Sequence, residues 1–382
     1  MKITILGPAH PYRGGIAALN ERLARQLVDE GNEVNIVSFN LQYPKFLFPG
    51  KTQFSEQKTT FSFQITREIN SVNPLNWLKV GLKIKKSRPE ILIVRFWLPF
   101  MSMSLGSICR IVKLNRYTKI ISIADNIIPH EKRIGDKVLC RYFIGSIDAF
   151  ITMSESVLND LAKFNYKKPK VLTPHPIYDH YGAVESREKA LLNLNLSKED
   201  RYILFFGFIR DYKGLDLLLN AFSNPYFKPN RIKLIVAGEF YTDHLKYLEL
   251  IKELKLEDDV ILHTSYISNK EVQHYFNGAD IVAQPYKSAT QSGVTQIGYH
   301  FNKPMLVTNV GGLAEIIPHM KVGYVVEPNP EDISKALIDF FENNRIEEFT
   351  NNILKEKERF SWDKMTNAIN QLASQIKKRK VK

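Results

Sequence analysis

The stretch FFGFIRDYKGLDLLLNAF (205–222) holds two cations, Arg210 and Lys213, between a buried strand and an amphipathic helix. Unpaired N–H groups and the helix dipole make a helix N-terminus favourable for anions. Arg offers a planar fork of donors and Lys a movable point charge, a combination suited to a diphosphate. The loop therefore predicts a diphosphate site. The alternative is that both cations are surface residues paired with Asp211 and Asp216.

Two other loops in the same half of the chain offer backbone and hydroxyl groups in front of a helix. In TNVGGLAEII (308–317), Gly311 and Gly312 allow close approach of the backbone. Glu315 lies in the first helical turn, where it accepts bonds from sugar or ribose hydroxyls or complements the dipole. In QPYKSATQSGVTQIGYHFNKP (284–304), hydroxyls and an amide precede Gly293. Taken singly, these features are also typical of a turn and of an N-cap.

Strand ends elsewhere add further candidate groups. HTSYIS (263–268) carries Tyr266 and Ile267, which can flank a planar base. GPAHPYRGGIAALN (7–20) places Gly14 and Gly15 at the start of a helix, where backbone can approach a ligand closely. This loop lacks the G-x-G-x-x-G pattern, and the next strand ends without an acidic residue, which disfavours a nicotinamide-dependent dehydrogenase.

The segment ADNIIPHEKR (124–133) gathers groups that can handle a proton. Asp125 and His130 lie there with Asn126 and Glu131, and they can orient or deprotonate an acceptor hydroxyl. A lone histidine is as often structural. The nine histidines are otherwise scattered, with no H-E-x-x-H and no D-x-D after a strand. We therefore expect no metal and no other cofactor, with Arg210 and Lys213 neutralising a diphosphate instead.

The chain is strongly basic, with a formal net charge of +13 in 382 residues. An anionic partner is expected: nucleic acid, acidic lipid or a phosphorylated substrate. Part of the excess lies in KVGLKIKKSR (79–88) and part in the final KKRKVK. These segments are either solvated surface or a docking site for anionic lipid headgroups. Five apolar residues lie in or beside the first segment, but their spacing does not define one helical face: Trp77, Leu78, Val80, Leu82 and Ile84.

The sequence disfavours nucleic acid as a partner, a thiolate metal site, and secretion. No basic stripe interleaved with aromatic residues and no helix-turn-helix appears, so nucleic acid is not expected as a partner. Only Cys109 and Cys140 are present, too few for a disulfide framework or a thiolate metal site. There is no secretory signal, and the most apolar stretch is broken by Arg95 and Pro99. A cytoplasmic location is expected, peripheral at the inner face of the membrane if the basic segment docks there.

Short apolar strands alternate with amphipathic helices along the whole chain, which indicates mostly parallel sheets covered on both faces. The alternation stops in the turn-rich segment 173–200 and then restarts. We therefore predict an α/β protein with two Rossmann-like, doubly wound domains, residues 1–180 and 181–360. Residues 361–382 form a last helix and a basic tail. Such sheets bind ligands beyond their carboxyl ends, so the two domains are expected to face a common cleft.

With these motifs in place, the chain resembles retaining glycosyltransferases of the GT-B fold, in the family 4 group found in bacterial polysaccharide and cell-envelope glycan synthesis. The resemblance covers nearly the whole chain, and its specificity lies in the order and spacing of the motifs. The stretches that carry it are RGGIAALNERLARQL, EVNIVSF, DNIIPHE, GFIRDYKGLDLLLNAF, IVAGE, GADIVAQPY, NKPMLVTNVGGLAEII, KVGYVVEP and EDISKALIDFF.

The resemblance implies a nucleotide-sugar donor on the second domain and a glycan or lipid-linked acceptor on the first. Arg210 and Lys213 would hold the diphosphate, and the last helix would cross back to the first domain. Gly14 and Gly15 would approach the donor across the cleft. Two positions after the IVAG strand, with the base-flanking pair, complete the implied pocket: Gly238, Glu239, Tyr266 and Ile267.

One departure from the family pattern concerns the donor sugar. The family has two glutamates eight positions apart before the segment that holds Pro304, and here those positions are Ala289 and Ile297. Gln291 and Gln296 lie nearby, with Ser292 and Gly293 between them, and they would bind the donor as neutral groups. Two alternatives stay open: a sugar-nucleotide epimerase, which needs no acceptor, and a transferase that has lost its activity.

Overall fold

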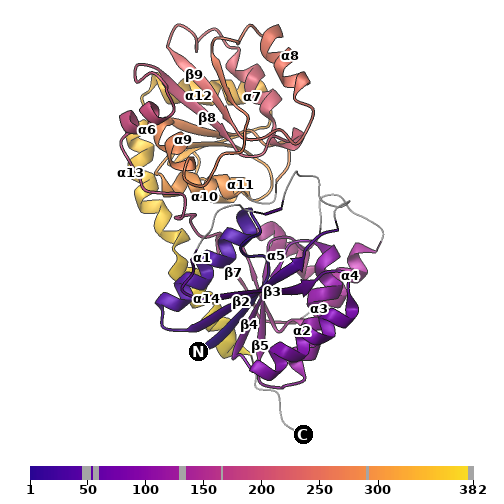
Figure 1. The fold of residues 1–382 in the computed structure, drawn as a ribbon. Helices are drawn as coiled ribbons and strands as arrows, with labels where there is room; N and C mark the ends of the chain where they lie inside the picture. Colours follow the sequence, from indigo (N-terminus) through magenta and orange to yellow (C-terminus); the bar gives the residue numbers. More distant parts are fainter. Residues whose placement is uncertain (45–52, 55–59, 129–134, 165–166, 290–291, 377–382) are drawn as a thin grey trace. The chain divides into compact units, whose positions relative to one another are not determined.

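The computed structural model describes residues 1–44, 53–54, 60–128, 135–164, 167–289 and 292–376. The chain divides into two compact units (Figure 1). Unit 1 comprises Met1–His175 together with Trp362–Lys382, and unit 2 comprises Pro176–Ser361. The chain thus leaves unit 1 once and returns to it with its last helix, which confirms the predicted return.

Unit 1 is built on a seven-stranded parallel sheet with the order β3-β2-β1-β4-β5-β6-β7. Its strands are β1 (Lys2–Leu6), β2 (Glu33–Leu41), β3 (Gln64–Asn70), β4 (Ile91–Phe96), β5 (Lys119–Ala124), β6 (Ala149–Thr152) and β7 (Lys170–Leu172). The order reverses between β1 and β4, which is the switch point where ligands of such sheets bind.

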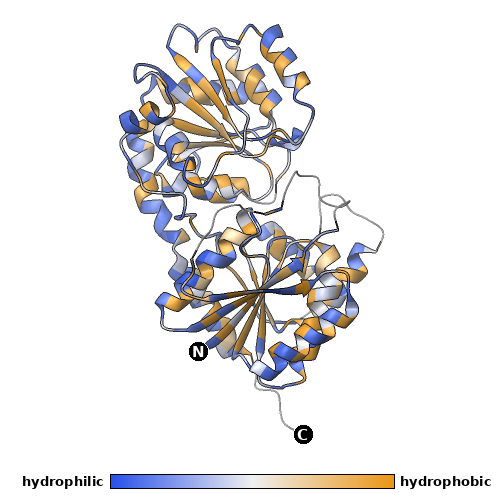
Figure 2. Ribbon diagram, viewed as in Figure 1, coloured by the Kyte–Doolittle hydropathy of each residue, from blue (hydrophilic) through white to orange (hydrophobic). Residues whose placement is uncertain are grey.

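Helices cover both faces of this sheet (Figure 1). The helices of unit 1 are α1 (Gly15–Asp29), α2 (Pro74–Ser87), α3 (Ser102–Lys113), α4 (Asp136–Ser146), α5 (Glu155–Ala162) and α14 (Trp362–Gln375), with a 3-10 turn η2 (Pro99–Met101). Helix α2 packs on α3 and α3 on α4, while α14 packs on α1, β5, β6 and β7. Because both faces are covered, the central strands are mostly apolar (Figure 2), and all six residues of β4 are buried, Arg95 among them.

Unit 2 repeats the plan with a six-stranded parallel sheet, order β10-β9-β8-β11-β12-β13. Its strands are β8 (Arg201–Phe206), β9 (Ile232–Ala237), β10 (Val260–His263), β11 (Ile281–Gln284), β12 (Met305–Thr308) and β13 (Gly323–Val326). Its helices are α6 (Arg187–Asn193), α7 (Leu215–Phe222), α8 (Leu245–Glu253), α9 (Val272–Gly278), α10 (Gly293–His300), α11 (Leu313–Ile316), α12 (Pro330–Glu342) and α13 (Ile346–Glu356), with 3-10 turns η3 (Asp211–Lys213) and η4 (Lys357–Phe360). The switch point here lies between β8 and β11.

The segment 173–200, predicted as a linker, contains a helix. Helix α6 packs on α9, and Ala190 and Leu191 are buried. A β-carbon on Gly278 would lie 3.0 Å from Leu191 Cδ2, so the glycine makes room for this leucine. The polar residues that suggested a linker cover the exposed side of a short helix, and its few apolar residues are the ones that pack.

Candidate functional site

The candidate site of unit 2 lies at the carboxyl ends of β8 and β11, which is the switch point of its sheet. The loop after β8 runs through η3, which holds Lys213, into the N-terminus of α7. The loop after β11 is tied to it, because Lys287 N donates to Tyr212 O at 2.7 Å. The two loops therefore form one frame around the predicted anion site.

Lys213 points its ammonium between these two strand ends. Its Nζ lies 5.2 Å from the centre of the Tyr286 ring, at the end of β11. A β-carbon on Gly207, at the end of β8, would lie 3.0 Å from Nζ and 3.7 Å from Val294 Cγ2 at the start of α10. Burial lowers the pKa of Lys213 to about 8; Tyr212 opposes this lowering and Arg210 adds to it.

Arg210 is held by an aromatic pair at the same edge. The rings of Phe208 and Tyr241 stack at 4.5 Å between centroids, and the guanidinium of Arg210 lies 5.3 Å over the Tyr241 ring. The backbone joins these loops as well, since Ile209 N donates to Glu239 O at 2.8 Å and Tyr241 N donates to Ile209 O at 2.9 Å. The arginine is thus fixed by packing and a cation–π contact.

Neither cation pairs with the carboxylates that flank it in the sequence. Asp211 accepts from Lys246, from Thr242 Oγ1 at 2.9 Å and from Tyr247 Oη at 3.3 Å. Asp216 accepts from Lys287 Nζ at 2.6 Å. Within the described ranges, no ion pair involves Arg210 or Lys213. The alternative of two cations paired with neighbouring carboxylates is therefore not what the fold adopts.

Glycines bring the backbones of these loops together. Gly207 has φ +102° and Gly238 has φ +141°, values that side chains rarely adopt. A β-carbon on Gly238 would lie 2.3 Å from Gly207 O, so only glycine fits there. Gly238, predicted from the family resemblance to line a pocket, supports the loop that carries Lys213, and Glu239 follows it at the same edge. The structure brings these two residues and the cations together.

The start of α10 approaches the site from a second side. Ser292 is buried and caps the helix by accepting from Val294 N at 3.2 Å, and its Oγ lies 3.3 Å from Tyr286 Oη. A β-carbon on Gly293 would lie 2.5 Å from Tyr178 Cε2, so this tyrosine packs directly on the helix start. Burial raises the pKa of Tyr286 to about 12.

The side-chain amide of Gln296 is a buried polar group without a hydrogen-bond partner among the described residues. Its side chain is fully buried on α10, and neither its Oε1 nor its Nε2 has a hydrogen-bond partner among the described residues. A buried amide normally has partners, so this one needs water or a ligand. Gln291, the other glutamine predicted near the donor sugar, lies outside the described residues.

The remaining predicted residues of unit 2 lie on the same sheet edge. Gly311 and Gly312 precede α11, and Glu315 is an exposed residue of that short helix. Tyr266 and Ile267 follow β10, which is the outermost strand on its side of the sheet. These residues lie at the same edge of the sheet as the cations.

Unit 1 presents a different arrangement at its own switch point. Gly14 and Gly15 begin α1, and a β-carbon on Gly14 would meet nothing within 4 Å. Asp125, just after β5, accepts from Arg95 Nε at 2.6 Å with one carboxylate oxygen and from Arg95 Nη2 with the other. Burial raises the pKa of Asp125, and the adjacent guanidinium opposes that rise. Both oxygens of the predicted acid–base group are thus engaged within the protein, and His130 lies outside the described residues.

Three residues that the sequence analysis did not assign now stand out. Arg95 is buried at the end of β4 and pairs with Asp125, and an arginine inside the apolar run ILIVRF was the available signal. Tyr286 lies just after β11, in a stretch where the hydroxyls and the amide before Gly293 were singled out. Tyr178 lies in the segment predicted as a linker, and no sequence pattern announces its contact with Gly293.

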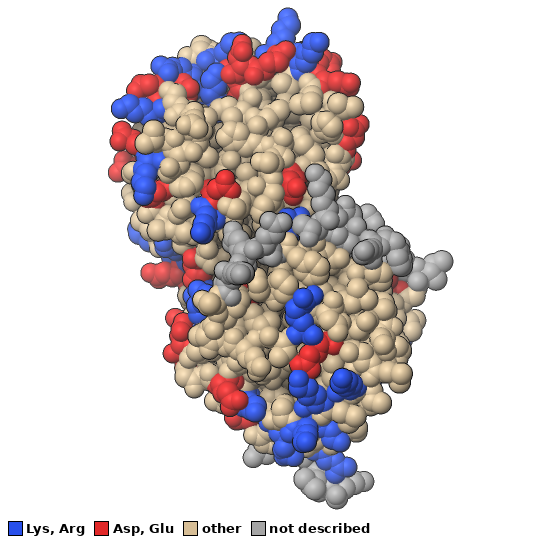
Figure 3. Space-filling model, in the orientation of Figure 1, with Lys and Arg blue, Asp and Glu red and all other residues tan. Residues whose placement is uncertain are grey.

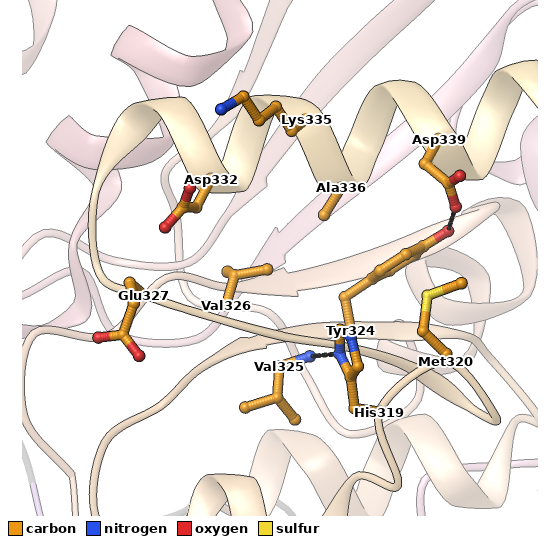
Figure 4. Close-up of a pocket in the computed structure, with 10 residues that line it drawn as sticks. All are labelled: His319, Met320, Tyr324, Val325, Val326, Glu327, Asp332, Lys335, Ala336 and Asp339. Atoms are coloured by element: carbon orange, nitrogen blue, oxygen red, sulfur yellow. Dashed lines mark hydrogen bonds between the residues drawn. The ribbon is translucent and has the colours of Figure 1, made fainter.

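The groove beside β13 is a separate feature (Figure 4). It encloses about 440 Å³ between the edge strand and α12. Two pairs of its polar groups bond to each other, since Tyr324 Oη donates to Asp339 at 2.6 Å and Val325 N donates to His319 Nδ1 at 3.0 Å. None of the predicted site residues lines it.

Two absences among the described residues concern membranes and metals. No helix there is long and apolar enough to cross a membrane. No group of three or more histidine, cysteine, aspartate or glutamate side chains is arranged to hold a metal ion in the part of the chain that the structure describes.

Comparison with known proteins places the chain among glycosyltransferases. Residues 186–375 match the family model described as glycosyl transferases group 1. An uncharacterized glycosyltransferase of Methanocaldococcus jannaschii is 24% identical over 394 aligned positions, covering 95% of each chain. The alpha-monoglucosyldiacylglycerol synthase of Streptococcus pneumoniae is 28% identical over 167 residues, 42% of this chain and 37% of that one. The structure of Anabaena HepE in complex with UDP has a TM-score of 0.75 at 14% identity, covering 98% of this chain and all of the other.

Proposed function

Because the chain is a glycosyltransferase with the GT-B fold, we propose that it transfers a sugar from a nucleotide-sugar donor to a glycan acceptor with retention of anomeric configuration. The carboxyl edge of unit 2 would bind the donor, with its diphosphate between Arg210 and Lys213. The retaining course follows from the resemblance to family 4 and goes beyond the family match itself.

The observation that carries this proposal is the unpaired ammonium of Lys213. It lies between the ends of β8 and β11, its pKa is lowered by burial, and no described carboxylate neutralises it. Such a group is costly to keep charged unless an anion arrives. The N-termini of α7 and α10 lie beside it, and both favour an anion. Anabaena HepE, which shares this fold, is described in complex with UDP, and this supports a nucleoside diphosphate as that anion.

The chemistry follows from where negative charge develops. In the transfer step, the bond between the sugar's anomeric carbon and the terminal phosphate oxygen breaks, and the pair of electrons leaves with the nucleoside diphosphate. Arg210 and Lys213 stabilise that growing charge, which lowers the barrier because the interaction is strongest in the transition state. The acceptor oxygen bonds to the anomeric carbon, and its proton passes to the departing phosphate. No metal ion is needed in this scheme.

The acceptor is proposed to be lipid-linked. One relative is named as a synthase of alpha-monoglucosyldiacylglycerol, which is a glycolipid, and the chain itself carries a net charge of +13. A cation-rich enzyme at the cytoplasmic face of a membrane would meet anionic lipids and a lipid-linked glycan together. Synthesis of a cell-surface polysaccharide is the process that this acceptor suggests.

The test is a turnover assay over a panel of UDP-, ADP- and GDP-sugars, following release of the nucleoside diphosphate. We expect Lys213→Ala to lower turnover by roughly 100- to 1000-fold, the effect of removing one preorganised charge-stabilising group. Lys287→Ala is the matched control, since this lysine lies on the same edge but pairs with Asp216. EDTA is expected to leave turnover unchanged.

Other outcomes point elsewhere. Equal activity of Lys213→Ala and wild type would refute the diphosphate role. Conversion of the donor's sugar without any acceptor would identify an epimerase. Absence of turnover with every donor, together with donor-induced thermal stabilisation, would indicate a transferase that binds but no longer reacts.

A further inference from the structure

Helix α2 is apolar on two sides, and only one of them faces the protein. Trp77, Val80 and Ile84 are buried, and Gly81 packs on α3, where a β-carbon would lie 2.8 Å from Ile111 Cβ. On the other side, three leucines are exposed to solvent. Leu75 is 79% exposed, Leu78 48% and Leu82 46%. The apolar residues of this segment therefore lie on two faces of the helix, one buried and one exposed.

The exposed leucines form a stripe with cations around it. At about 100° per residue, Leu75, Leu78 and Leu82 fall within roughly 60° of the helix circumference. Lys79, Lys83 and Lys86 are exposed alongside them; these six residues are called the α2 outer face. The helix carries four lysines and no acidic residue. Lys83 pairs with Glu68, while Lys79 and Lys86 form no ion pair among the described residues.

The neighbouring helices continue this surface. Helix α3 packs on α2 and α4 packs on α3, and each leaves apolar and basic residues exposed. These are Met103, Leu114 and Arg116 on or just after α3, and Lys137, Val138 and Arg141 on α4. Figure 3 shows Lys and Arg side chains gathered over the part of unit 1 that carries α2 and α3, with few acidic side chains among them. The α2 outer face is thus the most apolar part of a broader basic surface.

We infer that the α2 outer face docks on the surface of an anionic lipid bilayer, with the leucines inserted among the acyl chains near the headgroups. Clustered exposed leucines are unfavourable in water, and surrounding lysines complement lipid phosphates while their stems cover apolar surface. A second copy of the chain is a poorer occupant, because a two-fold contact would place lysines opposite lysines. Nucleic acid would use the cations but leave the leucines exposed.

This inference concerns a surface of unit 1 and does not depend on the transfer reaction. Vesicle binding is measured on the full chain without donor or acceptor, so it can succeed where the proposed activity fails, and the reverse. The probe is co-sedimentation with vesicles of phosphatidylcholine alone and of phosphatidylcholine mixed with phosphatidylglycerol.

We expect the wild type to sediment with the mixed vesicles and not with phosphatidylcholine alone. The triple variant Leu75→Ser, Leu78→Ser, Leu82→Ser should lose at least about tenfold in partitioning, since three apolar side chains leave the bilayer. The matched control is Leu192→Ser, Leu248→Ser, Leu354→Ser, which removes three exposed leucines from helices of unit 2. Lys79→Glu with Lys86→Glu should weaken binding and its salt dependence, whereas the exposed pair Lys252→Glu with Lys355→Glu should not.

Several results would overturn the inference. These are no sedimentation of the wild type with anionic vesicles, equal loss in the unit 2 control, or unchanged binding of the leucine triple variant. A dimer in solution that the triple variant abolishes would assign the face to a second copy instead. If the triple variant does not fold, Leu75→Ser alone, at the most exposed position, is measured in its place and should still weaken binding.

Discussion

The two sheets each place a cation at the switch point, but only one sheet supplies the counter-ion. In unit 1, Arg95 lies near the end of β4. A β-carbon on Gly7, in the loop after β1, would lie 3.0 Å from Arg95 Cβ, and Asp125 neutralises the guanidinium. In unit 2, Lys213 lies beside Gly207 at the end of β8 with no described carboxylate as partner. The same topology thus holds an internal ion pair once and an open charge once. The Arg95 guanidinium of unit 1 is neutralised within the fold itself, whereas the unpaired ammonium of unit 2 can be neutralised by an anionic ligand.

The largest effect is expected on the stability of unit 1 when the counter-ion of Arg95 is removed. Asp125→Ala leaves a buried guanidinium unpaired, so we expect the free energy of unfolding of unit 1 to fall by about 3–5 kcal/mol. The protein's three tryptophans, Trp77, Trp97 and Trp362, all lie in unit 1. Urea unfolding followed by tryptophan fluorescence therefore reports on this unit.

Two further variants serve as controls for that measurement. Asp216→Ala breaks the exposed pair with Lys287 and should cost no more than about 1 kcal/mol. The double variant Arg95→Met with Asp125→Leu removes both charges and should recover most of the stability lost in Asp125→Ala. Equal effects of Asp125→Ala and Asp216→Ala would contradict the structural role of the buried pair.

The open charge of unit 2 should make ligand binding depend on pH. The pKa of Lys213 is lowered to about 8, so the ammonium loses its proton above that pH. Because UDP is fully ionised there, with a phosphate pKa of about 6, its affinity should fall by up to about tenfold per pH unit between pH 8 and pH 10. Titration calorimetry measures this. The Lys213→Arg variant keeps its charge and should show a flat profile, and a falling profile in it would place the titration on another group.

The smallest effect concerns stability without ligand. A lysine whose folded pKa lies below its unfolded value of 10.5 binds its proton more weakly in the folded state. It therefore costs stability below pH 8, and that cost disappears as the pH rises toward 10.5. We expect Lys213→Met to stabilise ligand-free unit 2 by on the order of 1 kcal/mol at pH 7, with a smaller gain at pH 10. Urea unfolding followed by circular dichroism tests this; a loss of stability at pH 7 would contradict it.

The sequence predicted the architecture because its signals are local. Runs such as KITILG and EVNIVSF alternate with amphipathic helices, and alternation of this kind indicates a parallel sheet. The strand orders could not be predicted in this way, since β1 joins β2 and β4 from segments far apart in the chain. The segment holding α6 was misassigned because its partner Gly278 lies more than eighty residues away.

The candidate site could be predicted in part, because some of its signals are also local in the sequence. Arg210 and Lys213 stand out because a strand, a short loop and a helix follow one another in the sequence. Asp125 was singled out as a free acid–base group, but its state is set by Arg95, thirty residues earlier, which only the sheet brings close. The contact of Tyr178 with Gly293 is likewise tertiary. The diphosphate role of Lys213 and the acceptor role of unit 1 stay predictions.

The return of the last helix to unit 1 has a consequence for biosynthesis. Helix α14 packs on α1, β5, β6 and β7 and buries Ile369 and Leu372. A nascent chain that has emerged only as far as Ser361 can complete unit 2, whose residues are contiguous, but not unit 1, whose apolar surface still lacks its last helix. Chaperone-like protection is therefore needed longest by the half of the molecule that leaves the ribosome first.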